Sequence, residues 1–128
     1  MNAYETNITL GTALRTAFAT QDRELLGTLV HTDFVWMLPG ENQVSGDVIG
    51  VDGILGRFAK LAGYGVNISI EHVTVNAHGI ALILHNTGSH EGRILDEFLV
   101  SVVTIRDGKA AALETYLTDI PMMNAYFV

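Results

Sequence analysis

Two carboxylates, Glu97 and Asp119, are the residues of this sequence best suited to acid–base chemistry. Each follows the alternating apolar and polar pattern of a strand, at a position where its side chain would enter an apolar cavity. Two carboxylates that approach each other in such a cavity do not both ionise easily, so one pKa rises toward the range useful for catalysis. We therefore hypothesise that Glu97 is a general acid or base, tuned by Asp119 and held near Asn86.

The approach of these carboxylates depends on the hairpin at Asp107-Gly108, a dipeptide typical of tight two-residue turns. If this hairpin carries a bulge that pairs Ser101 with Thr115, Glu97 lies opposite Asp119. In the alternative interpretation, both carboxylates lie solvated at the rim of the cavity, or Asp119 caps the C-terminal segment. Ionisable pairs are often structural, so both interpretations stay open at this point.

His85 is the next catalytic candidate, because imidazole titrates near physiological pH. Alternation along its strand points it away from the cavity, where an interface or core role is more common than catalysis. A slip of one residue in the register would reverse this orientation. No two histidines stand four residues apart beside a glutamate, so we expect no metal site. The other histidines fall near element ends or in turns and are interpreted as surface residues: His31, His72, His78 and His90.

These side chains are positioned by helices that are followed by strands. Apolar residues recur with helical spacing over residues 10–18, 25–30 and 51–58, whereas from Gly65 onward they alternate as in strands. This order predicts an α+β domain whose curved sheet wraps three helices and leaves a cone-shaped cavity. The first helix is expected to end near Thr20, the second to start at the N-cap Asp22, and the third to span about 51–61. The expected strands cover residues 34–38, 66–77, 80–87, 93–106 and 109–119.

The composition excludes several classes of protein. The 128 residues suit one domain, and 14 acidic against 7 basic side chains argue against a nucleic-acid partner. The absence of cysteine removes disulfides and Cys-liganded zinc. The longest apolar runs, such as residues 79–84, are far shorter than the ~20 residues that cross a bilayer, and no signal peptide is recognisable. We expect a cytoplasmic protein without membrane contact.

Short motifs occur in a fixed order along the chain: Trp36 with Pro39-Gly40, Ser45-Gly46, Gly92-Arg93-x-Leu95-Asp96, Asp107-Gly108-Lys109 and Tyr116-x-x-Asp119. In this order the sequence resembles the nuclear-transport-factor-2-like (NTF2-like) superfamily, and within it the SnoaL-like proteins, which include polyketide cyclases. The resemblance covers residues 1–128 as a single domain. It implies the NTF2-like or cystatin-like cone, with three N-terminal helices packed against a curved, mixed, mostly antiparallel sheet. This fold hosts isomerases, cyclases, epoxide hydrolases, dehydratases and non-catalytic binders.

The catalytic residues known in the superfamily do not carry over to this sequence. The positions of the base Asp and the Tyr of ketosteroid isomerases hold Met37 and Leu14. The oxyanion-side acid of those enzymes falls near Leu99 or Ser101, and neither residue is a carboxylic acid. The triad of limonene-epoxide-hydrolase-like enzymes is absent as well. The His and Asp of SnoaL-type cyclases fall on Ser101 and Thr115, whose hydroxyls are unsuited to acid–base work near neutrality.

The same register gives the sheet an inner and an outer face. The inner face and the helices predict an apolar pocket with a few polar groups, which is typical of small-molecule sites. The outer face is apolar in its middle, and the resemblance implies a homodimer through it. The residues predicted to contact a small apolar molecule are Leu14, Phe18, Met37, Phe58, Leu84, Asn86, Leu99, Ser101, Thr115 and Leu117.

Together these observations favour a small, cofactor-independent enzyme that acts on an apolar, polyketide-like or polycyclic substrate. Its reaction would be cyclisation, isomerisation or dehydration through proton transfer. The competing hypothesis is a non-catalytic binding or assembly protein of the same fold, which the missing catalytic residues favour. A third is a subunit whose partner supplies the active groups. The apolar tail, residues 120–128, either closes the mouth of the cavity or crosses to a partner subunit.

Overall fold

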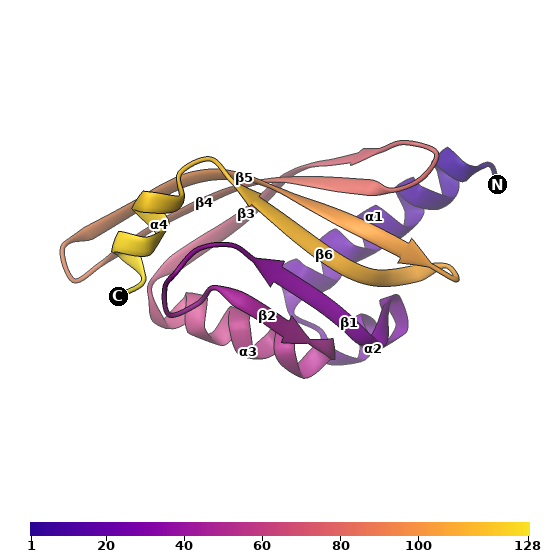
Figure 1. Ribbon diagram of the computed structural model, residues 1–128. Helices are drawn as coiled ribbons and strands as arrows, with labels where there is room; N and C mark the ends of the chain where they lie inside the picture. The colour runs from indigo at the N-terminus through magenta and orange to yellow at the C-terminus, as the bar shows by residue number, and fades with distance from the viewer.

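The first half of the chain supplies three helices, as its apolar periodicity predicts. The computed structural model describes residues 1–128. Helix α1 spans Ala3–Thr20, α2 spans Arg23–Leu29 and α3 spans Gly50–Gly63. The predicted N-cap of α2 is confirmed, since the Asp22 side chain accepts a hydrogen bond from the backbone N–H of Leu25. These helices cover one face of the sheet in Figure 1.

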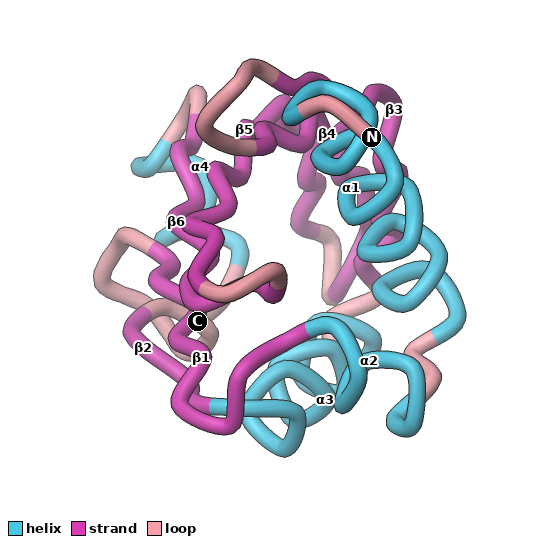
Figure 2. Tube along the Cα trace, turned by 90° about the vertical axis from the view of Figure 1, so that its right-hand side faces the viewer, coloured by secondary structure: helices cyan, strands magenta, loops and turns pink.

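Six strands form one sheet in the order β2-β1-β6-β5-β4-β3. Strand β1 pairs with β6 in parallel, and all other neighbours are antiparallel. The predicted mixed, mostly antiparallel sheet is therefore confirmed, and Figure 2 shows it curving around the space that the helices close. The strands are β1 (Val30–Leu38), β2 (Gly46–Ile49), β3 (Val66–Val75), β4 (Ile80–His90), β5 (Arg93–Arg106) and β6 (Lys109–Leu117).

Two tight hairpins join the long strands. The central residues of the β5–β6 hairpin, Asp107 and Gly108, have φ of 51° and 78°, and Glu91 and Gly92 of the β4–β5 hairpin have 50° and 80°. Positive φ at both central residues matches the right-handed twist of the flanking strands. The loop predicted over residues 88–92 is shorter than expected, because β4 continues to His90.

A bulge between Thr104 and Ile105 shifts the pairing of β5 with β6 and brings Ser101 opposite Thr115. This is the register on which the predicted position of Glu97 depends. Buried and exposed residues alternate along β5, and Glu97 takes a buried position between Leu95 and Leu99. A carboxylate thus stands in a row of core side chains.

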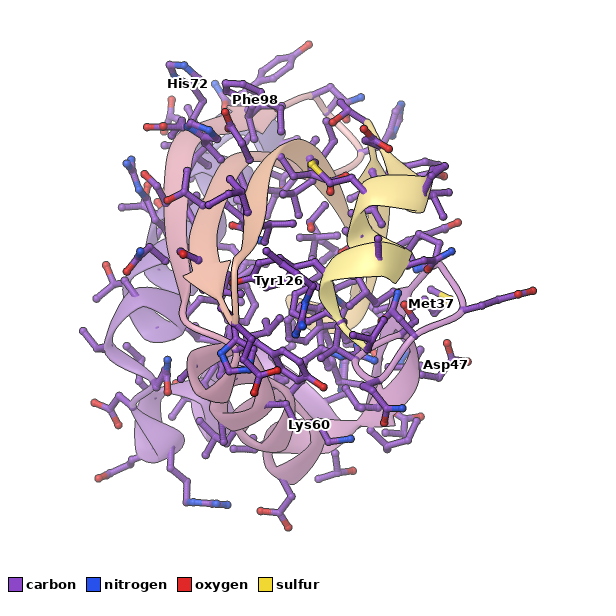
Figure 3. All side chains as sticks on the ribbon, turned by 90° about the vertical axis from the view of Figure 1, so that its left-hand side faces the viewer. Met37, Asp47, Lys60, His72, Phe98 and Tyr126 are labelled. Carbon is purple, nitrogen blue, oxygen red and sulfur yellow. The ribbon has the colours of Figure 1, made fainter.

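Two elements are not expected from the sequence. Strand β2 has only four, mostly exposed residues and lies at the sheet edge, so it lacks an alternating apolar pattern. The tail folds as a fourth helix, α4 (Ile120–Tyr126), which buries Met123, Tyr126 and Phe127 against its own chain. The Tyr126 hydroxyl donates to the backbone oxygen of Tyr64 at 2.5 Å, and Figure 3 shows Tyr126 beneath α4. No helix has the length and apolarity to span a membrane.

Arg57 of α3 is the buried cation of the core. Its guanidinium donates to the backbone oxygens of Trp36, Val44 and Gly46 at 3.1, 3.0 and 2.7 Å. It also stacks on the Trp36 ring at 4.7 Å from the centroid. Burial lowers the pKa of Arg57 to about 10, so the group stays charged at neutral pH. The side chain therefore ties α3 to β1 and to the loop before β2.

We predict that Arg57→Met lowers the free energy of unfolding by about 3 kcal/mol, because it leaves three buried carbonyl oxygens without a donor. Urea denaturation followed by circular dichroism measures this change. Arg23→Met is the matched control: Arg23 pairs with Asp52 on the surface, and its loss should cost less than about 1 kcal/mol. Equal losses in the two variants would contradict the anchoring role of Arg57.

Candidate functional site: the inner face of the sheet

Two small adjacent pockets lie between the inner face of the sheet and the helices. Their volumes are about 40 Å³ and about 30 Å³. Pockets that hold drug-sized ligands measure about 300–1,000 Å³, so in this conformation the site accepts only a very small molecule. Trp36, Leu61, Asn86 and Leu99 line both pockets. The first is otherwise lined by Phe18, Phe58, Ile68, Ile70, Leu82, Leu84, Ser101 and Leu113, and the second by Leu38, Leu95, Glu97, Leu117, Met123 and Phe127.

Glu97 is the acidic residue of the second pocket. The residue is 2% exposed. Its Oε1 accepts a hydrogen bond from the backbone N–H of Asp119 at 3.0 Å, whereas its Oε2 is buried without a partner. Removal of the carboxyl from water raises the pKa of Glu97, and the backbone hydrogen bond from Asp119 partly opposes this rise. One oxygen is therefore fixed in place, and the other is buried without a hydrogen-bond partner on a residue that lines the second pocket.

Asn86 supplies a second unsatisfied oxygen. It pairs with Glu97 across strands β4 and β5, and its Oδ1 is also buried without a hydrogen-bond partner. Buried polar atoms are almost always hydrogen-bonded in folded proteins. Two exceptions on neighbouring strands in one apolar pocket indicate a place for a ligand with a hydrogen-bond donor.

Asp119 does not join Glu97 as a second buried carboxylate, so the predicted pair needs correction. Its backbone lies beside Glu97, but its side chain is exposed and accepts a hydrogen bond from the backbone N–H of Met122 at 2.9 Å, as the N-cap of α4. The capping alternative is the one observed. Asp119 holds Glu97 through its backbone N–H, and its charge raises the pKa of Glu97 as a smaller cause than burial.

Three polar side chains form a buried chain at the first pocket. The indole Nε1 of Trp36 donates to Thr115 Oγ1 at 3.0 Å, and the hydroxyls of Thr115 and Ser101 lie 2.9 Å apart. Either hydroxyl can be the donor in this pair, because the Thr115 oxygen has a second lone pair beside the one that accepts from the indole. Ser101 lines the first pocket, and Thr115 does not. These hydroxyls can orient a ligand but are not acids or bases near pH 7.

His85 lies on the outer face, outside both pockets. Its ring stacks on Phe98 with centroids 4.1 Å apart, and its Nε2 lies 2.6 Å from Asp96 Oδ1. Figure 3 shows Phe98 on this outer side of the sheet. The register is not slipped, so the structure gives no support to the catalytic role considered for His85. No group of three His, Asp or Glu side chains is placed to hold a metal ion.

Seven of the ten predicted contact residues line one of the two pockets: Phe18, Phe58, Leu84, Asn86, Leu99, Ser101 and Leu117. Met37 does not, because the buried positions of β1 are Val30, Phe34, Trp36 and Leu38, and Met37 alternates to the other side. Leu14 is buried in the core and Thr115 lies behind Ser101, so both support the site without lining it.

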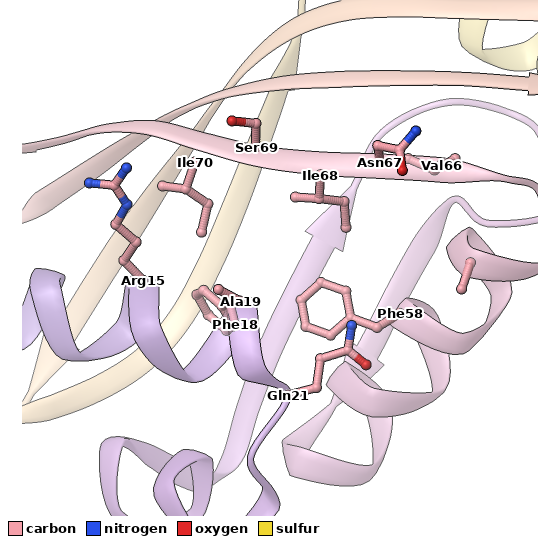
Figure 4. A pocket seen from close by; sticks show the side chains of 11 residues that line it. Arg15, Phe18, Ala19, Gln21, Phe58, Val66, Asn67, Ile68, Ser69 and Ile70 are labelled. Atoms are coloured by element: carbon pink, nitrogen blue, oxygen red, sulfur yellow. The ribbon is translucent and has the colours of Figure 1, made fainter.

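A groove of about 460 Å³ lies outside the first pocket, between α1, α3 and β3. Phe18, Phe58, Ile68 and Ile70 line both the groove and the first pocket, so they form the wall between them. Figure 4 shows Ile68 and Ile70 pointing from β3 toward the two phenylalanines, with Arg15 at one end. The remaining groove residues are Ala19, Gln21, Ala62, Val66, Asn67 and Ser69.

Sequence reasoning misses two residues that line these cavities, Trp36 and Arg15, and also Arg57, which lines none of them but stacks on Trp36. Arg57 carries a detectable signal, because it lies among Ile54, Phe58 and Leu61 on the apolar stripe of α3. The sequence favours a core role for Trp36, yet this residue lines both pockets. Arg15 has no signal in the sequence, since its place in the groove depends on how α1 packs on β3.

The profile of the SnoaL-like domain matches residues 12–113. The chain belongs to the SnoaL-like domain family. Among solved structures, this SnoaL-like domain is similar to Bal32a from a soil-derived mobile gene cassette, with 21% identity, 99% of this chain and 100% of that chain covered, and a TM-score of 0.87. A search of curated proteins finds no match.

Two other solved structures are similar over nearly their whole length. A protein of unknown function with a cystatin-like fold from Xanthomonas campestris shares 26% identity, with 99% of this chain and 98% of that chain covered and a TM-score of 0.79. IdmH, a candidate polyketide cyclase from Streptomyces antibioticus, shares 19% identity, with 94% and 96% covered and a TM-score of 0.69. The predicted NTF2-like, cystatin-like fold is confirmed.

The outer face of the sheet carries exposed apolar side chains, among them Phe98 and Tyr116, which are 54% and 55% exposed. Ile94 and Val102 are exposed on β5 as well. A contiguous exposed apolar surface is characteristic of protein interfaces. The homodimer expected through this face stays a prediction.

We predict that Asp119→Ala lowers the free energy of unfolding by about 1 kcal/mol, because it removes the N-cap of α4. Asp119→Asn retains an oxygen that can accept the same hydrogen bond, so its stability should stay within a few tenths of a kcal/mol of wild type. Urea denaturation of the three proteins measures both changes. Destabilisation of the Asn variant equal to that of the Ala variant would show that the charge, and not the cap, matters.

We predict that the stability gap between Glu97→Gln and wild type depends on pH. The pKa of Glu97 is raised above its ordinary value of 4.5 in the fold, so the folded state binds more protons than the unfolded state above that pH. Wild-type stability therefore falls as pH rises from about 4.5 to the folded pKa, by about 1.4 kcal/mol for each pH unit between these two values. The Gln variant lacks this fall. Denaturation curves at pH 4 and pH 8 compare them, and identical pH profiles would contradict the buried carboxyl.

Proposed function

We propose that this protein binds a small apolar molecule in the pockets of its inner face and promotes cyclisation, isomerisation or dehydration by proton transfer, with Glu97 as the general acid or base. The single observation that carries this proposal is the buried, unpartnered Oε2 of Glu97 inside an apolar pocket. Membership of the SnoaL-like family and the similarity to IdmH support it.

Proton transfer by Glu97 follows from its surroundings. A carboxyl of raised pKa is protonated in a larger share of molecules near neutrality, and its conjugate base is stronger than that of an ordinary glutamate. The N–H of Asp119 holds Oε1, so the proton is gained or lost at Oε2, which borders the pocket. Asn86 lies on the neighbouring strand, and its Oδ1 can accept a hydrogen bond from a substrate hydroxyl. This chemistry requires no cofactor.

The volume of the pockets limits the substrate. At about 40 and about 30 Å³, they do not hold a polycyclic molecule in this conformation. A larger substrate requires rotation of Phe18 and Phe58, which would join the first pocket to the groove of about 460 Å³. We therefore propose that the bound molecule is either small or enters past these two rings.

A non-catalytic binding protein is the second candidate function. The observation that favours it is the absence of a second acid–base group beside Glu97, because Asp119 is committed to capping α4 and His85 lies on the outer face. Isomerisation and dehydration commonly need both an acid and a base. In this alternative, Glu97 and Asn86 serve to recognise a ligand with hydrogen-bond donors.

The test uses 5-nitrobenzisoxazole, a bicyclic apolar compound that enters past Phe18 and Phe58 and ring-opens to a coloured phenolate when a base removes its C3 proton. In this step the C3 proton passes to Glu97, the C–H electron pair completes the carbon–nitrogen triple bond of a nitrile, and the N–O bond breaks to give the phenolate oxygen. We expect wild type to accelerate the reaction and Glu97→Gln to lose about 10²-fold or more of that rate. Quenching of Trp36 fluorescence reports binding independently, because the indole lines both pockets.

Asp119→Asn is the matched control, since it keeps the cap and the backbone N–H that holds Glu97. Its rate should remain within about threefold of wild type, because burial, and not the charge of Asp119, is the main cause of the raised pKa of Glu97. An undiminished rate in Glu97→Gln would overturn the role of Glu97. Quenching of Trp36 without any ring opening in wild type would favour the binding protein.

A further inference from the structure

Arg15 stands in the groove as a cation without a partner. It is exposed on α1 and makes no hydrogen bond or ion pair. Every other arginine has one: Arg23 pairs with Asp52, Arg57 with backbone oxygens, Arg93 with Glu91 and the Tyr126 backbone oxygen, and Arg106 with Asp33. Arg15 is thus the one guanidinium of this acidic chain that has no partner within the chain, and it is free to bind an anion.

The groove contains no carboxylate to neutralise this cation. The chain carries a formal charge of −7, yet none of the eleven residues that line the groove is acidic. The lining consists of apolar side chains, small polar side chains and Arg15. Arg15 at one end of the groove and the apolar side chains along it are complementary to a molecule that is apolar along its length and negative at one end.

The groove also lies against the first pocket, which Asn86 lines, and the second pocket, with Glu97, lies beyond it. Phe18 and Phe58 form part of the wall between the groove and the first pocket, and Asn86 lines the first pocket on the far side. An apolar body inserted between the two phenylalanine rings would therefore reach toward Asn86 and Glu97. Its other end would remain in the groove.

The backbone indicates which end of the groove receives the negative group. Helix α1 ends at Thr20 with Gln21 as its C-cap, where the negative end of the helix dipole disfavours an anion. Arg15 lies more than one turn earlier, beside Ile70 of β3 in Figure 4. Strand β3 is an edge strand, so the backbone N–H groups on its free side are available as further donors.

We propose that the groove binds the carboxylate of a small apolar acid, that Arg15 selects for this negative charge, and that the apolar body of the acid enters the pocket between Phe18 and Phe58. This inference deepens the proposed function, on which it rests for the identity of the inner pocket. It narrows the substrate class from apolar molecules in general to apolar carboxylates.

The experiment compares naphthalene-2-carboxylate with naphthalene-2-carboxamide, which has nearly the same shape but no charge. Isothermal titration calorimetry measures both dissociation constants. We expect wild type to bind the carboxylate about three- to fivefold more tightly than the amide, as for an exposed charge pair. Arg15→Met should remove this preference, and Arg15→Lys should keep most of it. Raising the salt concentration should weaken binding of the carboxylate only.

Lys109→Met is the matched control, because it removes one positive charge in the β5–β6 hairpin, outside the groove. It should leave the preference unchanged. Equal affinity of wild type for the two compounds, no binding of either, or a preference that survives in Arg15→Met would overturn the inference. Glu97→Gln should retain the preference for the carboxylate. Loss of turnover in Glu97→Gln therefore tests the proposed function, and loss of the preference in Arg15→Met tests the role of Arg15.

Discussion

The register of β5 against β6 is the constraint on which the site depends. The Asp107-Gly108 turn and the bulge at Thr104/Ile105 together set it. Because side chains alternate along a strand, a slip of one residue would turn Glu97 and Ser101 out to solvent and bring Phe98 into the core. The Asp107-Gly108 turn and the bulge at Thr104/Ile105 thus decide whether the Glu97 carboxyl lies on the inner face of the sheet.

Several parts of the fold were predictable because they follow from local chemistry. The Asp22 cap, the Asp107-Gly108 turn and the alternation along β5 depend on a few neighbouring residues, and each was found where it was expected. Strand β2 and helix α4 were not predictable in the same way. Residues 46–49 become a strand only because β1 is beside them, and the tail is helical where Asp119 caps it and the core accepts Met123 and Phe127.

The candidate site was predictable to the extent that it depends on strand alternation. Alternation along β4 and β5 predicted the inward position of four residues that line the pockets: Asn86, Glu97, Leu99 and Ser101. Met37 was misplaced because the alternation of β1 could not be counted from a nearby turn, and Trp36 takes the inward position instead. The cap that Asp119 forms is local, because its side chain accepts from the N–H of Met122 three residues on, and the sequence offered capping as one alternative. The place of Arg15 depends on the packing of α1 on β3, which no single segment of sequence encodes.

The parallel pairing of β1 with β6 also has a consequence for synthesis of the protein. Strand β1 ends at Leu38, but the neighbour that completes its hydrogen bonding on that side begins at Lys109. A ribosome that delivers residues in order releases β1 long before β6 exists, whereas α1 meets its main sheet partner, β3, by residue 75. Contacts that close such long loops form slowly. One edge of β1 therefore stays unpaired until β6, the last strand of the sheet, has been synthesised.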